Sequence, residues 1–258
     1  ILWLGLFFTA GPLMWMLLTA FTPPESLNSI PPEYGRFSLE NFKTLLSAGH
    51  ILRWSFNSLL VASAVTLAQT IFNSLAAFGF AAGRFKGKEA LFMVLLAAMM
   101  VPGQIVMLPL FLFMSKWNLI DSLWAVIMPS MAAPFGIYLI RQYMDAIPLQ
   151  LAQAAEIDGA SEYEIFRHIY LPLSKPILAT SGIFVFITQW NAFLWPLIIL
   201  NTDKHYTLTV GLSTLQEQQL LDYGLLMAGA TIAAIPMVAV FLVFSRFMLE
   251  GMRKGAIK

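Results

Sequence analysis

The sequence contains no cysteine, and its 15 Lys and Arg and 14 Asp and Glu residues make up only 11% of the 258 positions. The absence of cysteine excludes disulfide bonds, thiolate metal sites and cysteine nucleophiles. Charged residues normally account for roughly 25% of a soluble chain. Because 59% of the residues here are hydrophobic, the composition excludes an ordinary water-soluble domain and predicts a chain whose main solvent is lipid.

The sequence also lacks the patterns of several enzymes and of nucleic-acid-binding proteins. The net charge is +1 and the Lys and Arg residues form no dense cluster, which argues against nucleic acid as a partner. No His-Glu-x-x-His or Gly-x-Ser-x-Gly motif is present. The nearest approach to a phosphate loop, residues 83–89, is one spacer short and ends in Glu89, where Ser or Thr should hold Mg²⁺. We therefore expect no catalytic site, and no metal or cofactor bound by this chain.

Six long stretches contain no Asp, Glu, Lys, Arg or His. A helix of about 20 apolar residues crosses a hydrocarbon core about 30 Å thick, and each stretch reaches or nearly reaches that length. We therefore predict an all-α integral membrane protein, one domain over 1–258, with six transmembrane helices that are kinked at their prolines. Because the sequence begins with Ile1 rather than Met, we expect further residues before it. The six stretches are residues 1–24, 54–83, 90–115, 122–140, 176–202 and 223–245.

The connecting segments differ in positive charge. Segments on alternate sides of the predicted membrane carry ten Lys and Arg residues on one side and five on the other. The side with more positive charge faces the cytoplasm by the positive-inside rule, so we expect both termini inside. The ten lie in residues 84–89, 141–175 and 246–258, and the five in residues 25–53, 116–121 and 203–222.

The missing ionisable groups also bear on mechanism. Carriers that move protons usually keep such groups inside the membrane despite the cost, so a proton-coupled carrier is disfavoured. A sodium-coupled carrier stays open, because backbone carbonyls and hydroxyls at broken helices can bind the ion.

The longest predicted cytoplasmic segment, residues 141–175, carries its own helix signals. Pro148 suits the first turn of a helix that runs to about Asp158, and Gly159 is the residue expected just past its end. Ser161 and the glutamate three positions later fit a capping box, in which each side chain bonds the other residue's backbone N–H. This second helix should run to about Tyr170 and stop before Pro172. The spacing alone leaves open whether the two helices are a structured loop or a surface offered to a partner.

This segment resembles a known family. The run Gln153-Ala154-Ala155 is followed after three residues by Gly159, and after nine more by Ile169-Tyr170-Leu171-Pro172. The spacing is similar to the EAA loop of binding-protein-dependent ABC transporter permeases, which reads Glu-Ala-Ala, three residues, Gly, nine residues, Ile-x-Leu-Pro. Gln153 keeps the length of the family's Glu and loses its charge. Segments that resemble the carbohydrate branch are 158–161, 171–176, 190–197 and 227–230.

The resemblance implies a type I ABC importer permease fold, as the smaller, six-helix permease of a maltose-type sugar importer in a prokaryotic inner membrane. The implied partners are a second permease, two ABC ATPase subunits that bind ATP and Mg²⁺, and an extracytoplasmic solute-binding protein. The loop would be the coupling helix, seated in a cleft of an ATPase subunit, and the tail 247–258 resembles one that reaches the ATPase dimer. The implied coupling residues are Gln153, Ala154, Ala155, Glu156, Asp158, Gly159, Ala160, Ile169, Leu171 and Pro172.

A path for sugars should offer amides, hydroxyls and aromatic faces without fixed charge. Gln189, Trp190 and Asn191 in the fifth stretch fit this description, as do Gln104 in the third and Gln69 with Asn73 in the second. The alternative for such residues is hydrogen bonding between helices. Two other functions also stay open, namely an ABC permease for another small solute, such as a glycerol phosphodiester, and a sodium-coupled secondary carrier.

The charge asymmetry predicts which positions face outward. Because the chain has no cysteine, single cysteines can be introduced without background. Ser47→Cys and Ser213→Cys should react with an impermeant thiol reagent added to intact cells, whereas Ser161→Cys should react only after the membrane is opened. Labelling of Ser161→Cys in intact cells would reverse the predicted orientation.

Overall fold

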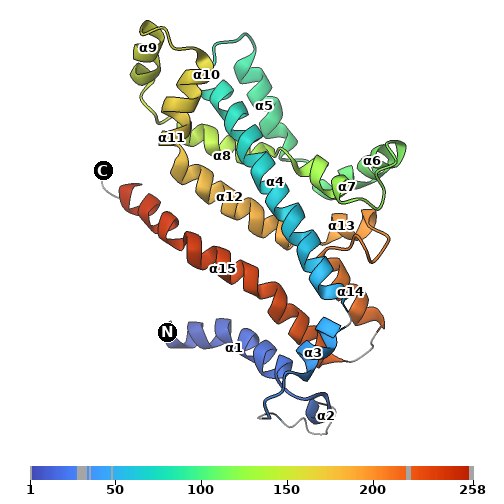
Figure 1. Ribbon diagram of the computed structural model, residues 1–258. Helices are drawn as coiled ribbons and strands as arrows, with labels where there is room; N and C mark the ends of the chain where they lie inside the picture. Colours follow the sequence, from blue (N-terminus) through green and yellow to red (C-terminus); the bar gives the residue numbers. More distant parts are fainter. Residues whose placement is uncertain (1, 28–33, 35, 48, 219–221, 256–258) are drawn as a thin grey trace. The chain divides into compact units, whose positions relative to one another are not determined.

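The computed structural model describes residues 2–27, 34, 36–47, 49–218 and 222–255, and all regular secondary structure in these ranges is helical (Figure 1). The helices in the first half are α1 (Leu2–Ala20), α2 (Pro24–Leu27), α3 (Glu40–Ser47), α4 (His50–Ala81), α5 (Lys88–Ala98), α6 (Gly103–Lys116), α7 (Leu123–Ile127) and the 3₁₀ turn η1 (Met128–Ser130). Those in the second half are α8 (Pro134–Met144), α9 (Leu149–Ile157), α10 (Glu162–Ile165), the π-helical η2 (Phe166–Tyr170), α11 (Leu171–Leu173), α12 (Lys175–Trp190), α13 (Leu194–Ile199), α14 (Leu208–Gln218) and α15 (Tyr223–Gly255).

Helical structure covers much of each predicted stretch. Three helical segments in the described ranges are long and apolar enough to cross a membrane: α4, residues 123–144 and residues 223–242. Two bent pairs, α5 with α6 and α10–α11 with α12, raise the number to five if each is one span, and α1 adds a shorter apolar helix. The prediction of an all-α membrane protein is thus confirmed, and the number six stays a prediction.

Three predicted spans are interrupted rather than continuous, and in 122–140 the break is residues 131–133, between η1 and α8. Within 90–115, α5 and α6 meet at an angle of 97°. Pro102 lies at this break; it has no N–H to donate and disfavours helical backbone in the residue before it, so the predicted proline kink is confirmed here. Within 176–202, α12 ends at Trp190 and the chain leaves the helix before α13 begins.

The chain forms two compact units. The first comprises residues 1–59 and 191–239, and the second comprises residues 60–190 and 240–258. The long helices α4 and α15 each contribute to both units.

In the first unit, the beginning of α4 holds the chain that follows α13. The Asn57 side-chain amide donates to the carbonyls of Lys204 and Tyr206 at 3.0 and 2.9 Å. The Trp54 indole N–H lies 3.1 Å from the carbonyl oxygen of Asp203 and 3.0 Å from its Oδ1. The loop after α13 is therefore bound to α4 by two side chains about one helical turn apart.

Two further bonds in this unit satisfy carbonyls at chain breaks. Asn41 of α3 donates from Nδ2 to the carbonyl of Ala20, the last residue of α1, at 3.0 Å. The carbonyl of Ala192 lies between α12 and α13, outside both helices, and so has no helical donor. The Thr209 hydroxyl of α14 donates to this carbonyl at 2.7 Å.

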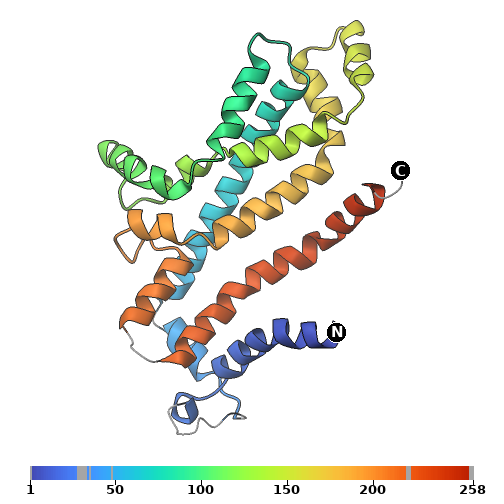
Figure 2. The ribbon, with the colours of Figure 1, turned by 180° about the vertical axis from the view of Figure 1, so that it is seen from behind.

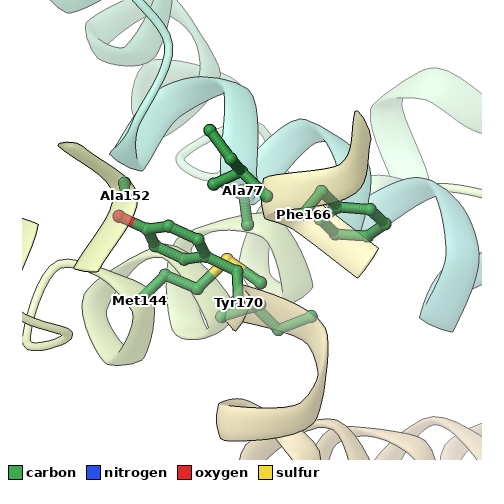
Figure 3. Packing of buried hydrophobic residues seen from close by; sticks show 7 residues of the cluster. Ala77, Met144, Ala152, Phe166 and Tyr170 are labelled. Atoms are coloured by element: carbon green, nitrogen blue, oxygen red, sulfur yellow. The ribbon is translucent and has the colours of Figure 1, made fainter. Parts of the chain in front are cut away.

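In the second unit, α8 lies alongside α12 (Figure 2), and a buried cluster joins α8 to the end of α4, to α9 and to the α10–η2 helix. Figure 3 shows the side chains of Ala77, Met144, Ala152, Phe166 and Tyr170 converging from these helices. The cluster attaches the loop helices to the end of α4.

A second contact links α5 to α8 in this unit. The Arg141 guanidinium lies 3.7 Å from the centre of the Phe92 ring and 3.2 Å from Glu89 Oε1. Arg141 lies in α8, directly after the charge-free stretch 122–140, and its side chain is largely buried. Its charge is balanced by a carboxylate and an aromatic face rather than by water alone.

Two side-chain amides of α4 form hydrogen bonds with the backbone at the break between η1 and α8. The carbonyl of Ser130, the last residue of η1, has no helical donor because the chain leaves the helix before α8 begins; Gln69 Nε2 donates to it at 2.7 Å. Asn73, which is 0% exposed, accepts from the Ala133 N–H at 3.2 Å and donates to the Gln69 side chain at 3.3 Å. Within this unit Gln69 and Asn73 therefore make the interhelical bonds that the sequence left as an alternative.

The helix that begins after Ser161 was expected to stop before Pro172, and this expectation is wrong. It continues through the π-helical η2 into α11, which ends at Leu173. The Leu171 N–H donates to the carbonyl of Phe166, five residues back. This wider turn shifts the hydrogen-bond pattern before the proline, whose missing N–H would otherwise interrupt it.

Some expectations fall on positions that are not described. Residues 28–33, 35 and 48 of the segment 25–53, which is predicted to face outward, lie outside the described residues. The backbone of α15 is helical to Gly255, and residues 256–258 of the expected tail lie outside the described ranges as well.

Removing the Asn73 amide should destabilise the protein. Asn73→Leu leaves the Ala133 N–H without its acceptor, so we expect the free energy of unfolding to fall by about 1–2 kcal/mol. Chemical denaturation in detergent measures the change. Gln104→Leu, which removes an exposed amide, is the control and should stay within about 0.5 kcal/mol. Equal losses in the two variants would contradict the role of Asn73.

Candidate functional site

The EAA-like segment folds as a short helix, a tight turn and a second helix. Helix α9 ends at Ile157, and Gly159 follows with a φ of +86°. The Gly159 N–H donates to the carbonyl of Glu156 at 3.0 Å, and the Ala160 N–H donates to that of Ala155 at 2.9 Å. This is the Schellman arrangement, in which a left-handed residue closes the helix end. The predicted glycine stop is confirmed.

The second helix begins with the predicted capping box. The Glu164 N–H donates to Ser161 Oγ at 3.4 Å, and the Ser161 N–H donates to Glu164 Oε2 at 2.8 Å. The bond from the Ser161 backbone, followed by that from its hydroxyl, lowers the pKa of Glu164, and His168 adds a smaller effect in the same direction. Because the folded-state pKa is depressed, the stabilisation is present above the ordinary glutamate pKa and is lost as the pH falls through the folded value.

Helix α9 presents two different faces. Ala152 is buried and Ala155 is partly buried against the cluster of α4, α8 and α10–η2. Gln153, Ala154 and Ile157 are exposed, and Ile157 is 87% exposed. Leu151, Ala154 and Ile157 recur three residues apart on the exposed side, so α9 presents a row of apolar side chains there rather than a single one.

A cavity of about 280 Å³ separates α9 and α10 from the end of α4. Arg84, just past the end of α4, reaches across to Glu156, with Nη2 3.4 Å from Oε2. Glu162 also lines the cavity. The sequence placed Arg84 only in the positively charged segment 84–89. Its partner, Glu156, is too far along the chain for local patterns to reveal.

The structure brings the ten predicted coupling residues into one part of the second unit. Ala155, Ala160, Ile169 and Leu171 pack against the buried cluster. The remaining six are exposed: Gln153, Ala154, Glu156, Asp158, Gly159 and Pro172. The first group therefore anchors the loop, and the second forms its outer surface except for Glu156, which lines the cavity.

The residues predicted for a solute path lie near helix breaks. Trp190, the last residue of α12, is 3% exposed and lies parallel to Phe186 with ring centres 6.1 Å apart. Asn191 follows at the break; it is exposed, and its Nδ2 lies 3.5 Å from the Met237 sulfur. Gln189 is half-buried.

Gln104 is exposed in the first turn of α6, next to the break between α5 and α6. No described contact joins it to the residues at the end of α12. Among the described residues, no group of three His, Asp or Glu side chains is arranged to hold a metal ion.

Comparison with known proteins shows a consistent set of relatives. Residues 69–250 match the family described as binding-protein-dependent transport system inner membrane component. The chain is 35% identical over 257 residues to the arabinooligosaccharides transport system permease protein of Halalkalibacterium halodurans, covering 98% of this chain and 92% of that protein. It is 31% identical over 258 residues to the lactose transport system permease protein of Rhizobium radiobacter, covering 100% and 94%.

The fold is also similar to that of a solved structure. A chain of a bacterial ABC transporter involved in the import of the acidic polysaccharide alginate superposes with a TM-score of 0.85 at 20% identity, covering 95% of this chain and 92% of that chain. At this identity the similarity shows the fold alone.

Proposed function

The chain belongs to the family of binding-protein-dependent transport system inner membrane components, and we propose that it is one of two permease subunits in an ATP-driven importer of sugars or oligosaccharides. The observation that carries this proposal is α9, which is anchored to the end of α4 on one side and exposes Ile157, Ala154 and Gln153 on the other. Such a surface suits a partner that drives movement from outside the bilayer.

In this proposal α9 is the coupling helix and sits in a cleft of an ABC ATPase subunit. The chain itself hydrolyses nothing; two ATPase subunits bind ATP and Mg²⁺ and supply the energy. Small residues such as Ala154 and Gly159 permit close approach, and Asp158 offers a carboxylate to basic groups of the partner. Since α9 packs on the cluster at the end of α4, a displacement of α9 is passed directly to a membrane-spanning helix.

The same proposal fixes the arrangement in the membrane. Six spans place both termini and residues 141–175 in the cytoplasm, in accordance with the ten-to-five distribution of Lys and Arg. A second permease completes the path, and an extracytoplasmic binding protein delivers the solute. The fifth span then consists of α12, the break at Asn191 and α13, and the third consists of α5 and α6.

The proposed solute class rests on two observations. The matched relatives are named for arabinooligosaccharides and lactose, and the charge-free stretches of this chain offer amides and aromatic rings without a fixed cation. An uncharged solute with many hydroxyls suits such a path better than an anionic phosphodiester. Gln189, Trp190, Asn191 and Gln104 are the proposed contact residues.

Gly159 tests the coupling role. A β-carbon added at Gly159 would meet no other atom of the chain. Gly159→Ala therefore destabilises the turn only through its left-handed backbone conformation, which costs a residue with a β-carbon about 1–2 kcal/mol. We expect partial loss of coupling from this change. Gly159→Asp also adds charge and bulk at the partner's cleft, so binding-protein-stimulated ATP hydrolysis and vanadate-sensitive sugar uptake should both be largely lost, with insertion unchanged.

The unaltered chain, purified with its ATPase subunits, is the reference for both Gly159 variants. Wild-type uptake by Gly159→Asp with the ATPase bound would refute the coupling role. Uptake by the unaltered chain alone, driven by a sodium gradient, would instead favour the alternative function of a sodium-coupled secondary carrier.

Asn191 tests the solute path. Asn191→Leu keeps the side chain compatible with lipid but removes its hydrogen bonds to hydroxyl groups, so uptake should fall about tenfold, as expected for one lost interaction of 1.4 kcal/mol. Assembly with the other subunits should be unchanged. Thr188→Val, an exposed position in the preceding turn, is the control. Lost assembly would indicate a structural role for Asn191, and unchanged uptake would remove it from the path.

A further inference from the structure

Glu156 has a partner within its own chain. Its Oε2 lies 3.4 Å from Arg84 Nη2 across the cavity between α9 and the end of α4. Leu149, Ala152 and Glu156 line the cavity from the α9 side, which is the spacing of one helix face. Glu156 therefore lies on the side of α9 that faces α4.

The backbone that carries Arg84 is itself held in place. Lys88 Nζ lies 3.2 Å from the carbonyl of Ala81 and 3.3 Å from that of Gly83, and donates to both. These carbonyls lie at the end of α4, where no further helical N–H is available. At Gly83 a β-carbon would collide with the carbonyl of Gly79, so the turn before Arg84 is close-packed.

The contact between α9 and α4 is incomplete without this pair. Ala152 packs into the buried cluster, and beside it the cavity of about 280 Å³ leaves a gap between α9 and the end of α4. The Arg84 and Glu156 side chains are 69% and 47% exposed, so their ion pair adds little to global stability. It does link the face of α9 that lines the cavity to the end of α4.

We propose that Arg84 is a positioning residue that holds Glu156, and through it sets the tilt of α9 against α4. This inference rests on the proposed function, in which α9 receives the movement of the ATPase. With the pair intact, α9 and the end of α4 move together. Without it, α9 can rock into the cavity, and part of the ATPase movement is lost before it reaches the membrane.

The test uses the complete transporter, reconstituted in vesicles, and measures sugar transported per ATP hydrolysed. Arg84→Gln and Glu156→Gln should each lower this ratio about two- to fivefold, the range expected for one exposed ion pair. The double variant should be no worse than either single variant, because both remove the same interaction. The exchange Arg84→Glu with Glu156→Arg should restore at least half of the loss. ATPase subunit binding should be unchanged throughout.

Glu162→Gln is the matched control, because Glu162 lines the same cavity and its carboxylate is not the one bound by Arg84. It should leave the ratio unchanged. Raising the salt concentration should reduce the difference between the unaltered transporter and the two single variants, since ions screen an exposed pair.

A second measurement does not depend on transport. Spin labels on Leu151→Cys and Lys86→Cys report the distance between α9 and the turn after α4, and Glu156→Gln should broaden its distribution in the isolated permease. An unchanged distribution, additive effects of the two single variants, or loss of ATPase binding only in Glu156→Gln would each overturn the positioning role. A broadened distribution with no ATP-coupled uptake by the unaltered transporter would refute the proposed function and leave the pair's structural role standing.

Discussion

The need to satisfy backbone polar groups governs the structure of this chain. In lipid no water is available for a carbonyl whose helical donor is missing, so each such group must find a partner in the protein. Such carbonyls occur where the chain leaves one helix before the next begins. The carbonyl of Ser130, at the end of η1, accepts from Gln69, and that of Ala192, between α12 and α13, accepts from Thr209. The polar side chains in these apolar segments therefore permit the helix breaks.

Local patterns predicted a large part of this fold from sequence. The charge-free stretches located the main helices, and Gly159 and the Ser161 capping box were found where the spacing placed them, because both depend on bonds within a few residues. The π turn before Pro172 was missed, since the sequence shows that the proline disrupts an α-helix but not how the chain accommodates it. The break after Trp190 was missed for a similar reason: its stabilising donor, Thr209, belongs to another helix.

The sequence likewise predicted some features of the candidate site and missed others. The family's spacing selected ten residues for the proposed coupling role, and spacing alone does not say which of them face inward. Ala155 and Ile169 proved to be anchors, whereas Gln153 and Asp158 lie on the outer surface. The partner of Glu156 could not be foreseen, because Arg84 is 72 positions away in the chain. Arg84 lies close to Glu156 because α4 packs against the loop, and this tertiary contact has no sequence pattern.

The π-helical turn η2 has a consequence for the whole of α12. A bond that spans five residues instead of four accommodates one more residue than an α-helical turn. One residue in an α-helix corresponds to a rotation of about 100°. Because the wider turn absorbs this extra residue, deleting a single residue from it would restore a regular α-helix and leave the residues that follow facing nearly as before. A one-residue deletion within α12 itself would instead rotate the residues after it by roughly that angle and carry part of its α8-facing side away from α8, so η2 is the place in this segment where a change in length disturbs the packing least.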